Sequence, residues 1–195
     1  MSKKRYRFYG GMLSAQEKWL NKMAAKGQRL IRTKKLLYEF EACHPGQYQY
    51  RIEFVGHKSK TNAADYRAFL EEMGYKVFDK NINLNYSVGK ARFRPWADQG
   101  GRVATNATTF NRELLIVEKE NDNTPFELHT SFEDRANYYG SLRNPWLFLF
   151  LLCGLFGIIY RSPVFGAFSL LALIPALLYQ LQVVKARRRA KTEEW

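Results

Sequence analysis

The stretch at residues 146–160 reads WLFLFLLCGLFGIIY, and the stretch at residues 164–184 reads VFGAFSLLALIPALLYQLQVV. Neither run holds a charged residue, and only Arg161-Ser162-Pro163 separates them. At ~1.5 Å per residue the second run reaches roughly 31 Å, enough to cross the ~30 Å hydrocarbon core of a bilayer. The first run reaches only roughly 23 Å, so whether it crosses the whole bilayer stays open. The two runs predict a transmembrane helical hairpin. The alternative is a hairpin buried in a soluble core, but soluble helices usually keep a polar face.

The flanks of the two runs predict how the hairpin is held in a cell membrane. Aromatic residues favour the membrane interfaces, and Lys and Arg favour the cytoplasmic side. We therefore expect a multi-pass protein with both termini in the cytoplasm, because the short turn carries only Arg161. Close packing of the helices is expected at small residues, namely Gly154, Gly157, Gly166, Ser169, Ala172 and Ala176. The predicted anchor residues are Trp146, Tyr160, Pro175 (at a kink), Tyr179, Arg187, Arg188 and Arg189.

Charge and position divide the chain into three parts. Residues 1–144 are expected to form a cytoplasmic α+β domain, residues 145–184 the hairpin, and residues 185–195 a basic cytoplasmic tail. The net charge is +13, of which residues 1–144 carry +9. Such a charge favours the anionic lipid of the inner leaflet as a partner. An unidentified protein partner and a homo-oligomer stay open, and nucleic acid is not expected because no known nucleic-acid module is recognisable.

The pattern of the soluble part predicts a β-α-β-β-α-β order, typical of ferredoxin-like folds. The expected strands lie at residues 5–9, 36–43, 48–55 and 75–78, and the helices at 14–27 and 62–74. Ser14 and Glu17 have the spacing of a capping box at the start of the first helix. A weak internal repeat supports two halves, because WLNKM at residues 19–23 resembles FLEEM at residues 69–73. A short helix at 132–142 is expected to lead into the hairpin.

Residues 80–112 do not fit this repeat and predict an inserted basic arm. Strand-like pieces interleave basic and aromatic residues with a single acid, Asp98. A solvated insertion is one interpretation. The sharper one is a surface that contacts lipid head groups or a partner. Its candidate contact residues are Lys90, Arg92, Phe93, Arg94 and Trp96.

No pattern typical of an active site stands out. His44, His57 and His129 have no metal-ligand spacing with one another or with Cys43 and Cys153. No glycine-rich phosphate loop and no nucleophile with a nearby base is recognisable. We therefore expect a non-enzymatic protein without a catalytic, cofactor or metal site.

Several segments resemble a family of bacterial proteins, domain-of-unknown-function family 2812. They are the run EKWLNKMAAKG at residues 17–27, PGQYQYRI at 45–52, FLEEMG at 69–74 and PFEL at 125–128. Members often carry C-terminal membrane helices and are often encoded beside PadR-like transcriptional regulators. The resemblance implies a membrane-linked regulatory role, and no family site residue can be transferred.

These observations lead to three hypotheses about function. The first is a membrane-anchored, non-enzymatic regulatory or sensor module that binds a protein or small ligand on its cytoplasmic domain. The second is an accessory subunit of a membrane transporter or export complex. The third, based on the basic charge alone, is a membrane-anchored DNA-binding regulator.

Overall fold

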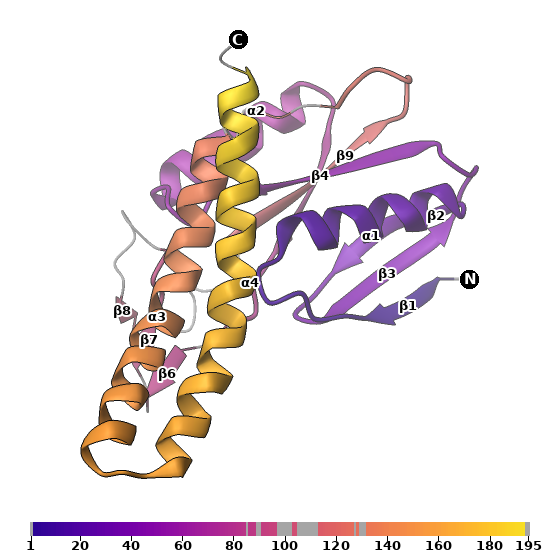
Figure 1. Ribbon diagram of the computed structural model, residues 1–195. Helices are drawn as coiled ribbons and strands as arrows, with labels where there is room; N and C mark the ends of the chain where they lie inside the picture. Colours follow the sequence, from indigo (N-terminus) through magenta and orange to yellow (C-terminus); the bar gives the residue numbers. More distant parts are fainter. Residues whose placement is uncertain are drawn as a thin grey trace. The chain divides into compact units, whose positions relative to one another are not determined.

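The computed structural model describes residues 2–84, 86–88, 91–96, 103–104, 113–126, 128 and 132–193. The chain divides into two compact units, Met1–His129 and Thr130–Trp195 (Figure 1). The first unit contains helices and antiparallel sheets, and the second is a pair of long helices. The predicted α+β class is therefore confirmed.

The first half of the first unit is a strand, a helix and a hairpin. Its elements are β1 (Lys3–Tyr6), α1 (Leu13–Ala25), β2 (Gln28–Thr33) and β3 (Leu37–Ala42). Strand β3 lies between β1 and β2 and is antiparallel to both (Figure 1). Strands β1 and β2 therefore run in the same direction, joined by α1, and β1 is an edge strand.

The second half repeats this arrangement. Strand β4 (Tyr48–Phe54) leads through α2 (Lys60–Glu72) to β5 (Lys76–Lys80), and β9 (Leu114–Glu120) pairs antiparallel between them. Between β5 and β9, the strands β6 (Tyr86–Val88), β7 (Ala91–Phe93) and β8 (Val103–Ala104) form a small sheet of their own. The WLNKM and FLEEM segments fall on the connecting helix of each half, so the internal repeat coincides with the structural one.

Strand β2 changes the predicted topology. The sequence QRLIRT at residues 28–33 has no clear alternation of apolar and polar residues and is not among the predicted strands, but it forms β2. Because β3 pairs with β1 and β2, the strands predicted at residues 36–43 and 48–55 do not form the hairpin that a ferredoxin-like order implies. Among the described strands, β3 and β4 belong to different sheets.

Helix α1 closes the open edge of β4 with two polar side chains. The Asn21 amide donates to the Tyr50 carbonyl at 2.8 Å and accepts from the Tyr50 N–H at 2.9 Å. One turn earlier, the buried Glu17 carboxylate accepts from the Arg51 guanidinium and from the Ile52 N–H. Side chains of the helix thus replace a missing neighbour strand. Glu17 is not part of a capping box, because α1 begins at Leu13 without a side-chain cap.

A buried polar network also joins the halves. The Leu30 N–H, released at a bulge in β2, donates to the Tyr50 hydroxyl at 2.8 Å. That hydroxyl donates to Glu118 Oε2 at 2.7 Å, and Glu118 Oε1 accepts from Arg29 Nε at 2.9 Å and Nη2 at 2.7 Å. Burial and the neighbouring Glu118 raise the pKa of Tyr50 far above its usual value, so its hydroxyl keeps the proton that it donates.

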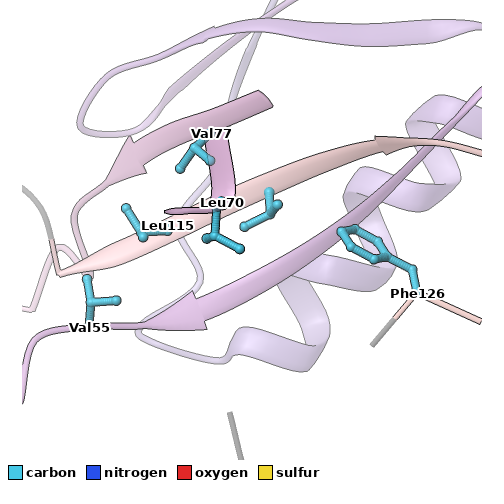
Figure 2. Packing of buried hydrophobic residues seen from close by; sticks show 6 residues of the cluster. Val55, Leu70, Val77, Leu115 and Phe126 are labelled. Carbon is cyan, nitrogen blue, oxygen red and sulfur yellow. The ribbon is translucent and has the colours of Figure 1, made fainter. Parts of the chain in front are cut away.

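The second half has an apolar core under α2. Leu70 of that helix lies beside Leu115 of β9 (Figure 2), and the cluster also includes Val55, Val77, Val117 and Phe126. Each of these six side chains is less than 10% exposed. Burial of each such side chain stabilises the fold by about 1.5–3 kcal/mol relative to exposure.

The second unit consists of α3 (Phe132–Ile159) and α4 (Pro163–Glu193). The helix expected at 132–142 and the first apolar run are one continuous helix that passes through Pro145. The expected contact of small residues is confirmed. A Cβ on Gly157 would lie 3.2 Å from the Gly166 nitrogen, Ser169 Oγ donates to the Phe150 carbonyl at 2.9 Å, and Ala172 and Ala176 are buried.

Candidate functional site

A cluster of exposed cations and large apolar side chains lies where β1 meets the turn between β2 and β3. The Arg7 N–H donates to the Leu36 carbonyl at 2.9 Å, which places the two segments side by side. Tyr6 and Phe8 are 71% and 60% exposed, and Leu36 is 42% exposed. We call this surface the basic–aromatic edge, and its exposed residues are Arg5, Tyr6, Arg7, Phe8, Lys34, Lys35 and Leu36.

None of the four cations of the basic–aromatic edge forms an ion pair with a described residue. The nearest carboxylate in the sheet register is Glu39, which lies opposite Lys4 on one side and Arg32 on the other. Arg7 is placed by an aromatic ring, because its guanidinium carbon lies 5.3 Å from the centre of the Trp19 ring. The charge of the edge is therefore directed to the solvent.

A buried lysine holds the turn from the inside. Lys80 is 3% exposed, and its ammonium donates to the carbonyls of Lys34 and Lys35, the latter at 2.6 Å. Its nitrogen also lies 4.0 Å from the centre of the Tyr38 ring. The Asn83 amide donates to the same Lys35 carbonyl at 2.6 Å. These contacts fix the backbone of the turn, while the side chains of Lys34 and Lys35 stay exposed.

Burial lowers the pKa of Lys80 to about 8. An amine with such a pKa is a candidate nucleophile or base in principle. Here the amine is enclosed by two backbone carbonyls and an aromatic ring, so it has a structural role: it positions the turn. Below this pKa the ammonium has donors for both carbonyls.

An aromatic cluster supports β1 from the side of α1. Trp19 lies between Tyr9, Tyr38 and Phe40, with ring centres 5.9, 5.0 and 5.5 Å away. Burial raises the pKa of Tyr9 to about 12. The contacts of Trp19 with Tyr38 and Phe40 are edge-to-face, and each such contact adds about 0.5–1.5 kcal/mol beyond the buried area. The packing of these aromatic rings therefore stabilises the basic–aromatic edge.

The residues of the contact surface expected at 90–96 differ in their exposure. Trp96 is 2% exposed, its indole N–H donates to Glu113 Oε1 at 3.1 Å, and it packs beside Gly56. Arg94 is 8% exposed. These two side chains are therefore buried in the domain, and the contact of this segment with lipid or a partner stays a prediction. Phe93 is exposed, Arg92 lies in β7, and Lys90 lies outside the described residues.

Glu113 is the reason that Trp96 and Arg94 point inward. Burial raises the pKa of this carboxyl, while the indole, the Ile82 N–H at 3.4 Å and the charge of Arg94 lower it. A buried carboxylate needs such donors. Neither the position of Glu113, just after the arm, nor its spacing from Trp96 indicates this pairing in the sequence.

The basic–aromatic edge was missed because of how its two segments read separately. The alternation of basic and aromatic residues at 5–9 predicts only a strand, and residues 34–36 contain no glycine or proline that would indicate a turn. The signal that could have found the edge is the run KKRYRF at residues 3–8 together with Lys34 and Lys35.

The predicted anchor residues of the second unit are placed as follows. Tyr160 is 68% exposed at the turn, beside Phe156 and Phe165. Tyr179 is 5% exposed. Pro175 lies inside α4, which continues through it. Trp146 is half-buried, and Arg187, Arg188 and Arg189 are exposed, the last with its guanidinium 5.9 Å from the centre of the Phe132 ring.

A polar contact marks the end of the apolar part of this unit. Arg143 Nη1 donates to Gln180 Oε1 at 2.6 Å, linking α3 to α4. From Pro163 to Gln180, α4 rises roughly 26 Å at ~1.5 Å per residue. The apolar part of the pair is therefore shorter than the run to Val184 suggests.

Other reactive side chains are dispersed. Cys43 and Cys153 are free thiols, one in each unit. Within the part of the chain that the structure describes, no group of three or more His, Cys, Asp and Glu side chains is arranged to hold a metal ion.

Comparisons with known proteins identify the family of the chain. Neither the curated proteins nor the solved structures include a significant match. A family model for proteins of unknown function, DUF2812, matches residues 13–151, from the start of α1 into α3. The match leaves β1, and with it half of the basic–aromatic edge, outside its limits. Because the model covers well over half of the sequence, the chain belongs to the DUF2812 family.

Proposed function

We propose that this protein is a membrane-anchored regulatory or sensor module, with the helix pair in the membrane and the α+β domain in the cytoplasm. One observation carries the proposal: both helices are long and apolar enough to cross a membrane, and only 6% of the apolar window of α3 and 22% of that of α4 are buried. Large side chains such as Phe148, Leu151, Ile158 and Leu170 are more than 60% exposed. Such a surface is far larger than soluble proteins usually expose.

The basic residues favour one orientation. Lys185, Arg187, Arg188, Arg189 and Lys191 follow the apolar part of α4, whereas the turn holds Arg161 alone. Short flanks rich in Lys and Arg stay in the cytoplasm. In this orientation the domain and the C-terminal end of α4 are on the cytoplasmic side.

The contacts between the helices support an anchor rather than a pathway. They use Gly157, Gly166, Ser169 and two alanines, and neither apolar run contains Asp, Glu, Lys, Arg or His. Polar routes through membranes generally need such residues. The functional contacts of the protein are then expected on the domain, where it binds a protein or small ligand.

Membrane insertion and orientation are tested on the full chain in bacterial cells. Carbonate extraction should leave the protein in the membrane fraction, and deletion of residues 146–184 should release a folded domain. Reporters that fluoresce only in the cytoplasm should be active at both termini. A full chain that is extracted as a soluble protein, or termini on opposite sides, contradicts the proposal.

The role of the hairpin is tested by exchange. Residues 146–184 are replaced by an unrelated two-span anchor of the same orientation, and the proteins cross-linked to the domain in cells are compared. If the hairpin acts only as an anchor, the domain should cross-link to the same partners with either hairpin. Loss of all of them, with the domain still folded, would favour the transporter-subunit hypothesis.

A further inference from the structure

We propose that the basic–aromatic edge binds the anionic lipid head groups of the membrane that holds the hairpin. This inference rests on the proposed membrane anchoring. Domain and hairpin are parts of one chain, so a membrane that contains the hairpin raises the local concentration of the domain near lipid. An additional weak contact with lipid then suffices to orient the domain.

The chemistry of the edge fits a lipid surface. Arg5, Arg7, Lys34 and Lys35 supply four cations without an ion-pair partner among the described residues, and anionic lipid attracts such cations. Their neighbours in the sequence include Tyr6, Phe8 and Leu36, whose exposed apolar surface favours the boundary between head groups and acyl chains. Successive side chains of β1 point to opposite faces of the sheet, so Arg5 and Tyr6 flank the edge strand on its two sides. A lipid surface that meets the strand edge-on can then contact both kinds of residue.

Protection of an edge strand alone does not explain this composition. Charged residues on an edge strand prevent pairing with other chains, and the lysines and arginines of β1 are sufficient for that purpose. Tyr6 at 71% and Phe8 at 60% exposure add apolar surface that costs free energy in water. A partner that removes this surface from water accounts for both kinds of residue.

Contacts with the interior of the domain also stabilise the backbone of the basic–aromatic edge. Lys80 and Asn83 fix the carbonyls of Lys34 and Lys35, and the Trp19 cluster supports Arg7. A rigid surface loses less conformational entropy on binding. Neither element of this support takes part in the lipid contact itself, so the exposed side chains can be exchanged without removing it.

The test uses the full chain in lipid nanodiscs, with hydrogen exchange as the readout. Discs of phosphatidylcholine are compared with discs that also contain phosphatidylglycerol, and the hairpin is inserted equally in both. We expect slower exchange at residues 3–8 and 34–37 only in the anionic discs, and loss of this protection at high salt. Exchange at β9 reports folding in the same experiment.

Two variants and a matched control locate the contact. Each cation near an anionic surface changes binding by roughly fivefold. Lys34→Gln with Lys35→Gln should therefore lower the ratio of the lipid-bound to the lipid-free state of the edge by roughly 25-fold. Tyr6→Ser with Phe8→Ser should weaken protection without changing its salt dependence. Lys18→Gln with Lys22→Gln, two exposed positions on α1, changes the charge equally and should have little effect.

Three outcomes overturn the proposal. Equal exchange at the edge in neutral and anionic discs excludes the lipid contact even if the hairpin is inserted, which separates this inference from the proposed anchoring. An equal effect of the α1 control shows attraction by net charge alone. Protection by a single-stranded oligonucleotide, but not by lipid, assigns the edge to nucleic acid.

Discussion

The Tyr50 hydroxyl allows a quantitative test of how the two halves of the domain are joined. Tyr50→Phe removes one oxygen atom from a side chain that is 1% exposed and leaves its ring in place. The Leu30 N–H, on a residue that is 0% exposed, loses its acceptor, and Glu118 loses a donor. The packing of the ring is unchanged, so the effect is specific to the hydrogen bonds.

The expected cost follows from these two lost bonds. A buried N–H without a partner costs about 1–3 kcal/mol, and a hydrogen bond to a charged group contributes about 1.5–3 kcal/mol. Arg29 still neutralises Glu118, so the two costs do not add fully. We expect Tyr50→Phe to lower the free energy of unfolding of the domain by about 2–4 kcal/mol, a large part of the ~5–15 kcal/mol of an ordinary domain.

The control for this prediction is Tyr48→Phe. The Tyr48 ring lies 4.2 Å from the Arg29 guanidinium and is 8% exposed, but its hydroxyl forms no hydrogen bond with a described residue. Its loss should change stability by less than about 0.5 kcal/mol, as is usual away from such networks. The measurement is denaturant unfolding of the full chain in detergent, followed by hydrogen exchange at β4 and β9. Equal effects of the two variants would refute the reasoning.

Three further predictions concern the other contacts. Asn21→Ala should destabilise the domain by about 1–3 kcal/mol, because two hydrogen bonds to the β4 edge are lost; faster exchange of β4 amides, with β5 unchanged, is the readout. Burial lowers the pKa of Lys80 from 10.5 to about 8, so between these pH values the unfolded chain binds a proton that the folded chain has released. Unfolding titrations should therefore show that stability rises with pH in this window, by about 3 kcal/mol at most, and that Lys80→Met flattens the rise. Gly157→Ala should loosen the helix pair, because its Cβ would lie 3.2 Å from the Gly166 nitrogen. Gly140→Ala has open space around it and should instead stabilise α3 by up to about 1 kcal/mol. Disulfide trapping between α3 and α4 distinguishes the two variants.

Local patterns were sufficient to predict several features of this protein. Two uncharged apolar runs indicate the helix pair because their composition alone excludes a polar face, and glycines, alanines and a serine mark where the helices touch. The two connecting helices and most strands follow from the spacing of apolar residues and from turn signals. The segments that resemble DUF2812 lie within the matched residues 13–151.

Contacts between distant residues could not be predicted in this way. The hairpin partner of β3 is β2, and the polar residues of β2 interrupt the alternation that would predict a strand. Trp96 and Arg94 look like surface residues in a basic arm, but Glu113 gives them polar partners in the interior. Glu17 has the spacing of a capping residue, but it binds Arg51 and Ile52 of a strand that follows much later in the chain.

The sequence by itself determined the apolar helix pair, the α+β composition, the basic charge and the family of this protein, because each depends on residue type and near-neighbour spacing. Only the tertiary structure decided which basic and aromatic residues form a surface. Pairing of β1 with β3 brings residues 5–8 beside residues 34–36, and Lys80 fixes that turn from a strand far along the chain. Such a surface depends on strand register and on buried hydrogen bonds, which the local pattern of a sequence does not specify.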